Sequence, residues 1–184
     1  MIKYYQYVKI RKRDKQVADS GITKRALAKS FSELMETESF GKISIGEICD
    51  RCEMNRKSFY YHFRDKQDLI IWMFKYDMSN AGNFDENDSL TDYITKICGC
   101  LYEKKSFYRK ALKIEGQNSL TDYIRDIIYD RMSRQSRIDS ELSRYICGYT
   151  SDAVVVSIKR WICENDQKTC EQFVSFLFNA AGFQ

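Results

Sequence analysis

One short stretch, residues 55–64, carries an unusual set of side chains for a protein surface. Cations, hydroxyls and flat rings crowd into two helical turns, and no acidic residue lies between Asn55 and Arg64. These residues are Arg56, Lys57, Ser58, Tyr60, Tyr61 and His62. Cations and hydroxyls bind phosphate oxygens, and a few side chains of a helix in the major groove read base edges. The stretch therefore indicates a helix that contacts double-stranded DNA.

We expect two kinds of contact from this surface. The side chains predicted to bind phosphates are Ser58, Tyr60 and Lys66. The side chains predicted to read base edges are Arg56, Lys57 and Tyr61. Ser44, at the start of the preceding helix, belongs to the same predicted surface. His62 has two interpretations, a further phosphate contact or a ring that faces the core.

Capping residues define the helices that position these side chains. Ser44 and Glu47 have the S-x-x-E spacing of a capping box, in which each side chain satisfies a backbone donor at the start of a helix. Asn55 is a suitable N-cap for the next helix, which is predicted to run to about residue 63, and Asp65 for a third, predicted over 65–79. The apolar residues expected to face inward are Ile45, Ile48, Cys49, Phe59 and Phe63.

This ordered set resembles the DNA-binding domain of the TetR family of bacterial regulators. In that family a Ser or Thr opens the second helix and an Ile or Leu follows four residues later, as Ser44 and Ile48 do here. The recognition helix carries Ser/Thr-x-Tyr-x-His/Tyr-Phe, which matches residues 58–63, and Lys-x-x-Leu follows at 66–69. The resemblance covers about residues 20–75. It implies a three-helix DNA-binding domain with its helix-turn-helix at about 44–63.

Two departures from the family pattern bear on the site. Cys52-Glu53 stands where the family usually has Ala-Gly, so a positive φ at Glu53 would cost about 1 kcal/mol relative to glycine. Gly46 lies where some members place a base-contacting side chain. We therefore expect specificity to depend more heavily on the recognition helix.

Composition predicts an all-α fold. The 184 residues include no proline and only 8 glycines, so helices meet few breakers. Positive charge gathers in the predicted DNA-binding part, since residues 1–66 hold 15 Lys or Arg against 9 Asp or Glu, while residues 67–184 hold 15 against 17. The chain has a single histidine and no glycine-rich phosphate loop, which argues against an enzyme and against a cofactor.

The seven cysteines are expected to be reduced thiols of a cytoplasmic protein, because no apolar signal segment opens the sequence. Cys49-x-x-Cys52 has a spacing that metal sites use, but only one histidine, His62, is available as a further ligand. We interpret this pair as packing residues and expect no metal.

We divide the chain into a basic extension over 1–19, a DNA-binding domain over 20–79 and a helical domain over 80–184. The basic run at 9–13 has three interpretations: an arm on DNA, a leader, or a short helix on a neighbour. The first domain helix is predicted over 20–38, capped by Ser20 or Thr23. Its apolar stripe, spaced i, i+4, i+7 and i+8, is Leu27, Phe31, Leu34 and Met35.

Later helices are predicted over 89–105, 106–114, 119–136, 140–164 and 168–183. Ser-Leu-Thr-Asp-Tyr-Ile occurs at both 89–94 and 119–124, which we interpret as convergent helix starts rather than a repeat architecture. The helix over 140–164 is apolar on all sides, but Asp152, Lys159 and Arg160 exclude a membrane span. The resemblance implies that helices 140–164 and 168–183 form a homodimer interface.

The expected function is a DNA-binding transcriptional regulator that binds a palindromic operator as a homodimer. The family resemblance also implies control by a small effector, whose site is unknown. Gln117 and Asn118 are either part of such a site or simply a polar loop. Residues 107–119 are similar to a branch of activators associated with dihydroxyacetone kinase operons. The alternatives are an activator that depends on a partner protein and a helical adaptor that binds no DNA.

Overall fold

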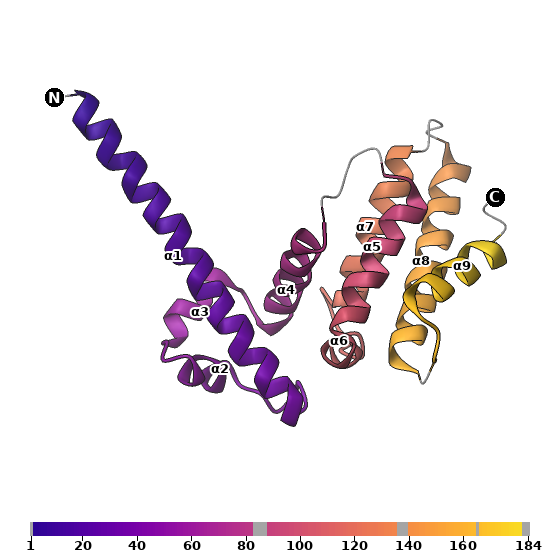
Figure 1. The fold of residues 1–184 in the computed structure, drawn as a ribbon, viewed down its shortest axis with the longest axis horizontal. Coiled ribbons are helices and arrows are strands. Elements are labelled where there is room, and N and C mark those ends of the chain that lie inside the picture. Colours follow the sequence, from indigo (N-terminus) through magenta and orange to yellow (C-terminus); the bar gives the residue numbers. More distant parts are fainter. Residues whose placement is uncertain (1, 83–87, 136–139, 165, 182–184) are drawn as a thin grey trace. The chain divides into compact units, whose positions relative to one another are not determined.

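The computed structural model describes residues 2–82, 88–135, 140–164 and 166–181, with side chains from residue 20 to 179 in these ranges except Gln135. This part of the chain forms nine helices and no strand (Figure 1), which confirms the all-α prediction. It separates into two compact units, Met1–Leu69 and Ile70–Gln184. The predicted domain limits of 20–79 and 80–184 stay a prediction, and residues 83–87 of the expected linker lie outside the described residues.

Helix α1 spans Ile2–Thr37. The end of the predicted 20–38 helix is correct, but its predicted start at Ser20 or Thr23 is wrong. No proline interrupts residues 2–37, and the first glycine is Gly21. Because no helix breaker precedes Ser20, the helix begins well before the predicted start. The side chains of the basic run at 9–13 lie outside the described side chains, and their role stays open.

The first unit builds a small core where α1 packs on α2 (Ile45–Arg51) and α3 (Arg56–His62). The predicted stripe of α1 is buried, as are Phe59 and Phe63 of the α3 segment. Each such fully buried apolar side chain contributes about 1.5–3 kcal/mol relative to exposure. The buried Ser30 hydroxyl donates to the carbonyl of Ile48 at 2.7 Å, which fastens α1 to α2.

The remaining helices are α4 (Lys66–Asn80), α5 (Leu90–Glu103), α6 (Lys105–Ala111), α7 (Leu120–Gln135), α8 (Glu141–Cys163) and α9 (Cys170–Ala181). These bounds match the predicted ranges to within a few residues. In the second unit α5, α7 and α8 lie side by side (Figure 1). Trp161 of α8 stacks against Tyr102 of α5 at 5.4 Å between ring centroids and against Phe173 of α9 at 4.4 Å. No helix of the described residues has the length and apolar character needed to cross a bilayer.

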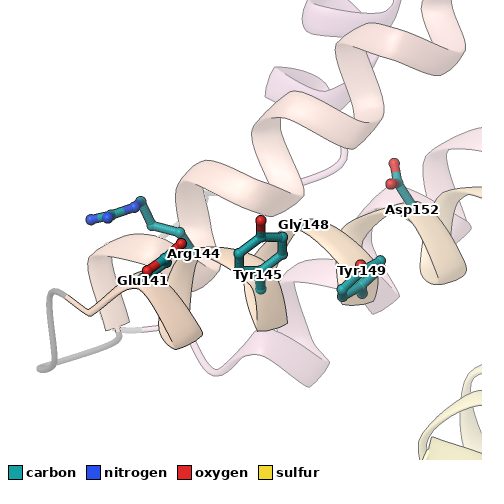
Figure 2. A pocket seen from close by; sticks show the side chains of 6 residues that line it. All are labelled: Glu141, Arg144, Tyr145, Gly148, Tyr149 and Asp152. Atoms are coloured by element: carbon teal, nitrogen blue, oxygen red, sulfur yellow. The ribbon is translucent and has the colours of Figure 1, made fainter.

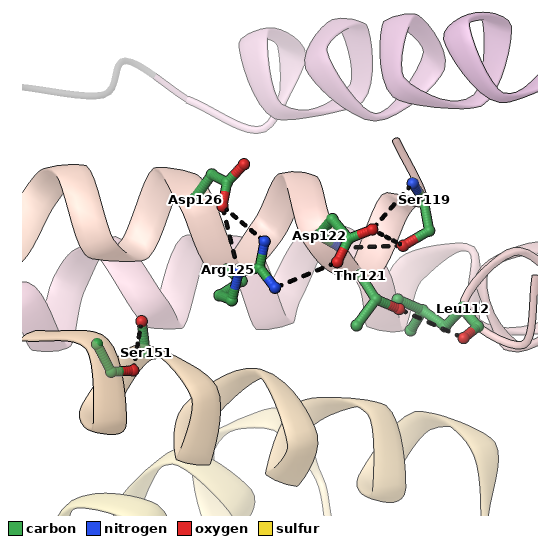
Figure 3. A network of polar contacts seen from close by, with 8 residues as sticks. Leu112, Ser119, Thr121, Asp122, Arg125, Asp126 and Ser151 are labelled. Carbon is green, nitrogen blue, oxygen red and sulfur yellow. Dashed lines mark hydrogen bonds and ion pairs between the residues drawn. The ribbon is translucent and has the colours of Figure 1, made fainter. Parts of the chain in front are cut away.

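The two identical hexapeptides both start helices. The hydroxyls of Ser89 and Ser119 each accept from the backbone N–H of the aspartate three residues on, at 3.1 Å. Ile94 and Ile124, at the end of each hexapeptide, are fully buried. Figure 3 shows the second cap, with Arg125 adding ion pairs further along α7. The same hexapeptide therefore starts two helices with the same N-cap, as predicted.

A buried polar contact joins α4 to the following helices. The Tyr108 hydroxyl donates to Oδ2 of Asp77 at 2.6 Å, and Lys104 Nζ lies 2.5 Å from Oδ1 of the same carboxylate. Tyr108 has no exposed surface, and its ring also contacts Phe74 edge-on. Burial, followed by the hydrogen bond to Asp77, raises the pKa of Tyr108 well above its ordinary value. The end of α4 is thus anchored by a charge-assisted hydrogen bond from a buried tyrosine.

Candidate nucleic-acid interface

The predicted capping box at the start of α2 is present. The Ser44 hydroxyl accepts from the backbone N–H of Glu47 at 3.2 Å, and the Glu47 carboxylate accepts from the backbone N–H of Ser44 at 2.7 Å. The bond from the Ser44 backbone lowers the pKa of Glu47. The box fixes the start of α2, and the outer surface of Ser44 stays exposed.

A tight joint separates α2 from α3. Glu53 adopts φ 56°, the left-handed conformation that glycine usually supplies in this joint. The N–H of Met54 closes the turn by donating to the carbonyl of Cys49 at 2.9 Å. Asn55 then caps α3, accepting from the N–H of Ser58 at 2.9 Å, as predicted. The chain therefore keeps the joint geometry without its glycine.

Helix α3 has two chemically different sides. Phe59 and Phe63 are buried, whereas Tyr60 is 58% exposed and Tyr61 is 72% exposed. The Tyr60 ring contacts Phe59 edge-on at 5.7 Å between centroids, so an aromatic core residue supports the exposed ring. The exposed side presents rings and hydroxyls on a short helix whose inner side is fixed by packing.

The exposed cations of α3 differ from the arginines on either side of the helix in their ion pairs. Arg56 and Lys57 are exposed and make no hydrogen bond or ion pair with another described residue. By contrast, Arg51 pairs with Glu33 at 2.8 Å and Arg64 lies 3.9 Å from Asp68. The positive charge of the α3 side chains is therefore available to an external anion.

Ser58 and His62 are half-buried. The Ser58 hydroxyl lies 3.3 Å from Oδ1 of Asn55, to which it donates. Burial, and to a lesser degree the charge of Lys24, lowers the pKa of His62. A ring nitrogen of His62 that carries a proton can donate to a phosphate.

Lys66 has an arrangement that sequence reasoning missed. Its ammonium donates to the carbonyl of Phe40 at 2.6 Å and to the carbonyl of Ile43, and it lies 4.2 Å from the centroid of the Phe40 ring. Burial lowers the pKa of this amine. An ammonium has three N–H donors, so one remains for a phosphate. No motif indicates this contact, because the partners lie 23 and 26 residues earlier in the chain.

The cysteine pair and the polar turn also have defined places. Cys49 is buried and Cys52 half-buried, and burial raises the pKa of both thiols. No group of three His, Cys, Asp or Glu residues in the described part of the chain is placed to hold a metal. Gln117 and Asn118 are exposed on the turn before α7, where Asn118 has φ 59°. Their arrangement fits the polar-loop interpretation.

A second surface lies along α8. Its exposed apolar side chains follow helical spacing opposite the buried face, and they are Leu142, Tyr145, Ile146, Tyr149 and Val156. Tyr145 and Tyr149 stack at 6.0 Å between centroids. They border an open groove of about 430 Å³ that runs from Glu141 to Asp152 (Figure 2). On α9, Phe176 is also exposed. We name the five α8 residues the apolar strip.

Two family models and a characterised relative match the chain. A family model described as bacterial regulatory proteins, tetR family, matches residues 32–71, and one described as a transcriptional regulator C-terminal region matches residues 88–181. The HTH-type dhaKLM operon transcriptional activator DhaS of Lactococcus lactis is 25% identical over 170 residues, which is 85% of this chain and 89% of that protein.

Solved structures share the fold. A structure of the dihydroxyacetone kinase operon activator DhaS has a TM-score of 0.60 at 21% identity, covering 88% of this chain and 97% of that one. A TetR transcriptional regulator from Streptococcus agalactiae has a TM-score of 0.63 at 14% identity, with 90% and 96% covered. NalD, a secondary repressor of a multidrug efflux pump in Pseudomonas aeruginosa, has a TM-score of 0.59 at 14% identity, with 89% and 96% covered.

Proposed function

The chain belongs to the TetR family, whose members are DNA-binding transcriptional regulators and not enzymes, and on that premise we propose that it binds a palindromic operator as a homodimer. One observation carries the proposal for the DNA surface. The exposed side of α3 presents Arg56 and Lys57, which form no hydrogen bond or ion pair with another described residue, beside the exposed rings of Tyr60 and Tyr61. Charges left unpaired on a surface gain most from neutralising phosphates and releasing counterions.

In this proposal, each side chain has a role that its position supports. Arg56, Lys57 and Tyr61 read base edges in the major groove. The phosphate contacts come from the hydroxyl and imidazole groups around them, Ser44, Ser58, Tyr60 and His62. Lys66 mainly holds the carbonyls of the loop at 40–43 and offers its third N–H to a phosphate. Such a protein acts in the cytoplasm, where bacterial DNA lies.

The test is a selection of duplex DNA on purified protein, from genomic fragments and random sequence, at two salt concentrations. We expect an enriched site with two symmetric halves about one helical turn apart, or about 34–36 Å. Lys57→Ala should weaken binding to that site, whereas Lys113→Ala, an exposed lysine of the second unit, should not. Failure of the wild-type protein to enrich any sequence or to be retained on DNA at low salt would favour the helical adaptor.

We assign dimer formation to α8 and α9. The apolar strip is exposed along four turns of α8, and Phe176 adds an exposed ring on α9. A stable interface needs roughly 800 Å² from each partner and is richest in aromatic residues at its centre. The exposed Tyr145 and Tyr149 of α8 and Phe176 of α9 are aromatic residues of the kind found at such centres.

Sedimentation tests this assignment. Tyr149→Asp places an aspartate at a position that is 71% exposed, so it should leave the folded chain intact but oppose dimer formation. Thr91→Asp, at an exposed position near the start of α5, is the matched control and should sediment as the wild type does. An unchanged dimer in Tyr149→Asp would move the interface away from α8.

We further propose that the regulator activates transcription, because the activator DhaS of Lactococcus lactis resembles 85% of this chain. A small effector or a partner protein is the expected input to the second unit. A reporter fused to the selected operator should give more transcript when the wild-type protein is present. A fall in transcript would instead indicate repression, and Arg56→Ala should abolish either response.

A further inference from the structure

Gly46, the second residue of α2, lies directly beneath the side chain of Arg56 from α3. A Cβ built on Gly46 would lie 2.6 Å from Nη2 of Arg56, 3.2 Å from Nε and 3.3 Å from Cζ. Real Cβ atoms do not approach other heavy atoms as closely as 2.6 Å. The guanidinium therefore occupies the space that any side chain at residue 46 would need.

The two residues are coupled through this shared space. Gly46 has no side chain, yet the residue is buried. Arg56, which lies over it, is exposed. The guanidinium thus covers the backbone of α2 with one part and remains accessible to solvent with another. Contact with a rigid helix restricts the rotamers of a long side chain, so less conformational entropy is lost when Arg56 binds a ligand.

Glycine in this helix needs a reason. Glycine favours a helix less than alanine does, by about 1 kcal/mol in a helix interior, and Gly46 lies in the first turn of α2. Gly46 has no left-handed φ that would require glycine. Gly41 and Gly99 would accept a Cβ with no atom within 4 Å, whereas Gly46 would not. The Arg56 guanidinium fills the space that a Cβ at residue 46 would enter, so it must move when a larger residue stands there.

We propose that Gly46 is a specificity-determining residue of the DNA surface, because it positions the Arg56 guanidinium to read a guanine in each half of the operator. The inference depends on the proposed DNA-binding function. A larger residue at 46 pushes the guanidinium off α2, and the bidentate contact to guanine O6 and N7 is then lost or misplaced. Gly46 itself touches no base; it acts through Arg56.

The experiment measures dissociation constants for the selected operator and for a variant in which the guanine assigned to Arg56 is replaced in both halves. A bidentate arginine contact discriminates between bases by about 5- to 150-fold. Gly46→Ala should remove most of this preference. Arg56→Ala should reduce it at least as much, and adding Gly46→Ala to Arg56→Ala should have no further effect, as expected for residues that act through one group.

Two further variants keep the result interpretable. Gly41→Ala, in the same unit, meets no atom and should retain the wild-type preference. Arg56→Lys leaves Gly46 untouched and keeps the charge, but it lacks the planar guanidinium, so it should weaken the guanine preference. Gly46→Ala should melt at or above the wild-type temperature, since alanine favours the helix.

The outcomes separate the two proposals. If the wild type selects no DNA, the proposed function fails. If the wild type selects an operator but Gly46→Ala keeps its guanine preference, the inference fails alone. It also fails if Gly46→Ala reduces the preference equally with arginine or alanine at residue 56, because the glycine then acts independently of Arg56.

Discussion

Replacing Lys66 by methionine separates the two roles that its position allows. Methionine keeps an unbranched apolar stem of similar length but removes the ammonium. The carbonyls of Phe40 and Ile43 then lose a charged donor, and the Phe40 ring loses the cation that lies 4.2 Å from its centroid. If the ammonium mainly holds the loop, the variant loses stability.

The expected loss follows from these contacts. A hydrogen bond to a charged group contributes about 1.5–3 kcal/mol net, and an exposed cation–π contact about 0.5–1 kcal/mol. The sum is an upper bound, because the ammonium is half-buried and gives up hydration, as the lowered pKa of Lys66 indicates. The loop carbonyls can also bind water in the variant. We therefore expect a loss of about 2 kcal/mol in the free energy of unfolding.

The assay combines thermal unfolding with the salt dependence of DNA binding. For a chain of this size, 2 kcal/mol lowers the melting temperature by about 4–8 °C. Lys57→Met is the matched control, because Lys57 is exposed and makes no hydrogen bond or ion pair with another described residue. That variant should change the free energy of unfolding by less than about 0.5 kcal/mol but weaken DNA binding.

The opposite pattern would refute the reasoning. Lys66→Met would then unfold at the wild-type temperature, and its logarithmic salt slope would become shallower by about 0.9 for each chain. Such a result would mean that the ammonium leaves the loop carbonyls and neutralises a phosphate.

Three further substitutions test the packing and the local geometry. Tyr108→Phe should lower the free energy of unfolding by about 2 kcal/mol in urea titrations, because Asp77 loses a charged hydrogen bond, while Tyr102→Phe, at an exposed ring, should have little effect. Because the pKa of Tyr108 is raised in the folded state, only the unfolded state loses this proton just above pH 10.0. The stability that Tyr108 contributes is therefore full below that pH and falls above it. Tyr108→Phe should make the decline in the free energy of unfolding between pH 9 and 11 smaller. Asn55→Ala should cost about 1 kcal/mol by removing the cap of α3, measured by circular dichroism melts, and Asn55→Asp should restore it. Glu53→Gly should stabilise the protein by about 0.5–1 kcal/mol in the same melts, and a loss would show that the left-handed conformation at φ 56° is not strained.

Local signals explain which parts of the structure were predictable. Ser44, Asn55 and Ser89 act on backbone groups within three residues, so spacing alone identifies these helix starts. The burial of Phe59 and Phe63 follows from helical periodicity. The start of α1 was missed because a hydroxyl such as Ser20 caps a helix only where the preceding chain is not helical.

Contacts between distant residues were not predictable in the same way. The Lys66 ammonium was expected to face DNA, but its carbonyl partners lie in a loop whose path depends on the packing of α1. The fit of Arg56 over Gly46 depends on the angle between α2 and α3 and on one side-chain rotamer. Sequence patterns describe periodicity along one helix and carry no information on such distances.

If the apolar strip of α8 pairs two copies, as proposed, the effect of this protein on a gene depends on its amount in the cell. If the dimer is the form that binds DNA, the concentration of that form rises with the square of the chain concentration wherever single chains predominate. A modest increase in synthesis then produces a sharp rise in operator occupancy. If α8 is the dimer interface, as proposed, a newly made chain exposes Leu142, Tyr149 and Val156 until it meets a second copy. Exposed apolar surface of this kind favours aggregation, so the regulator is expected to be scarce, quickly paired, or bound by chaperones.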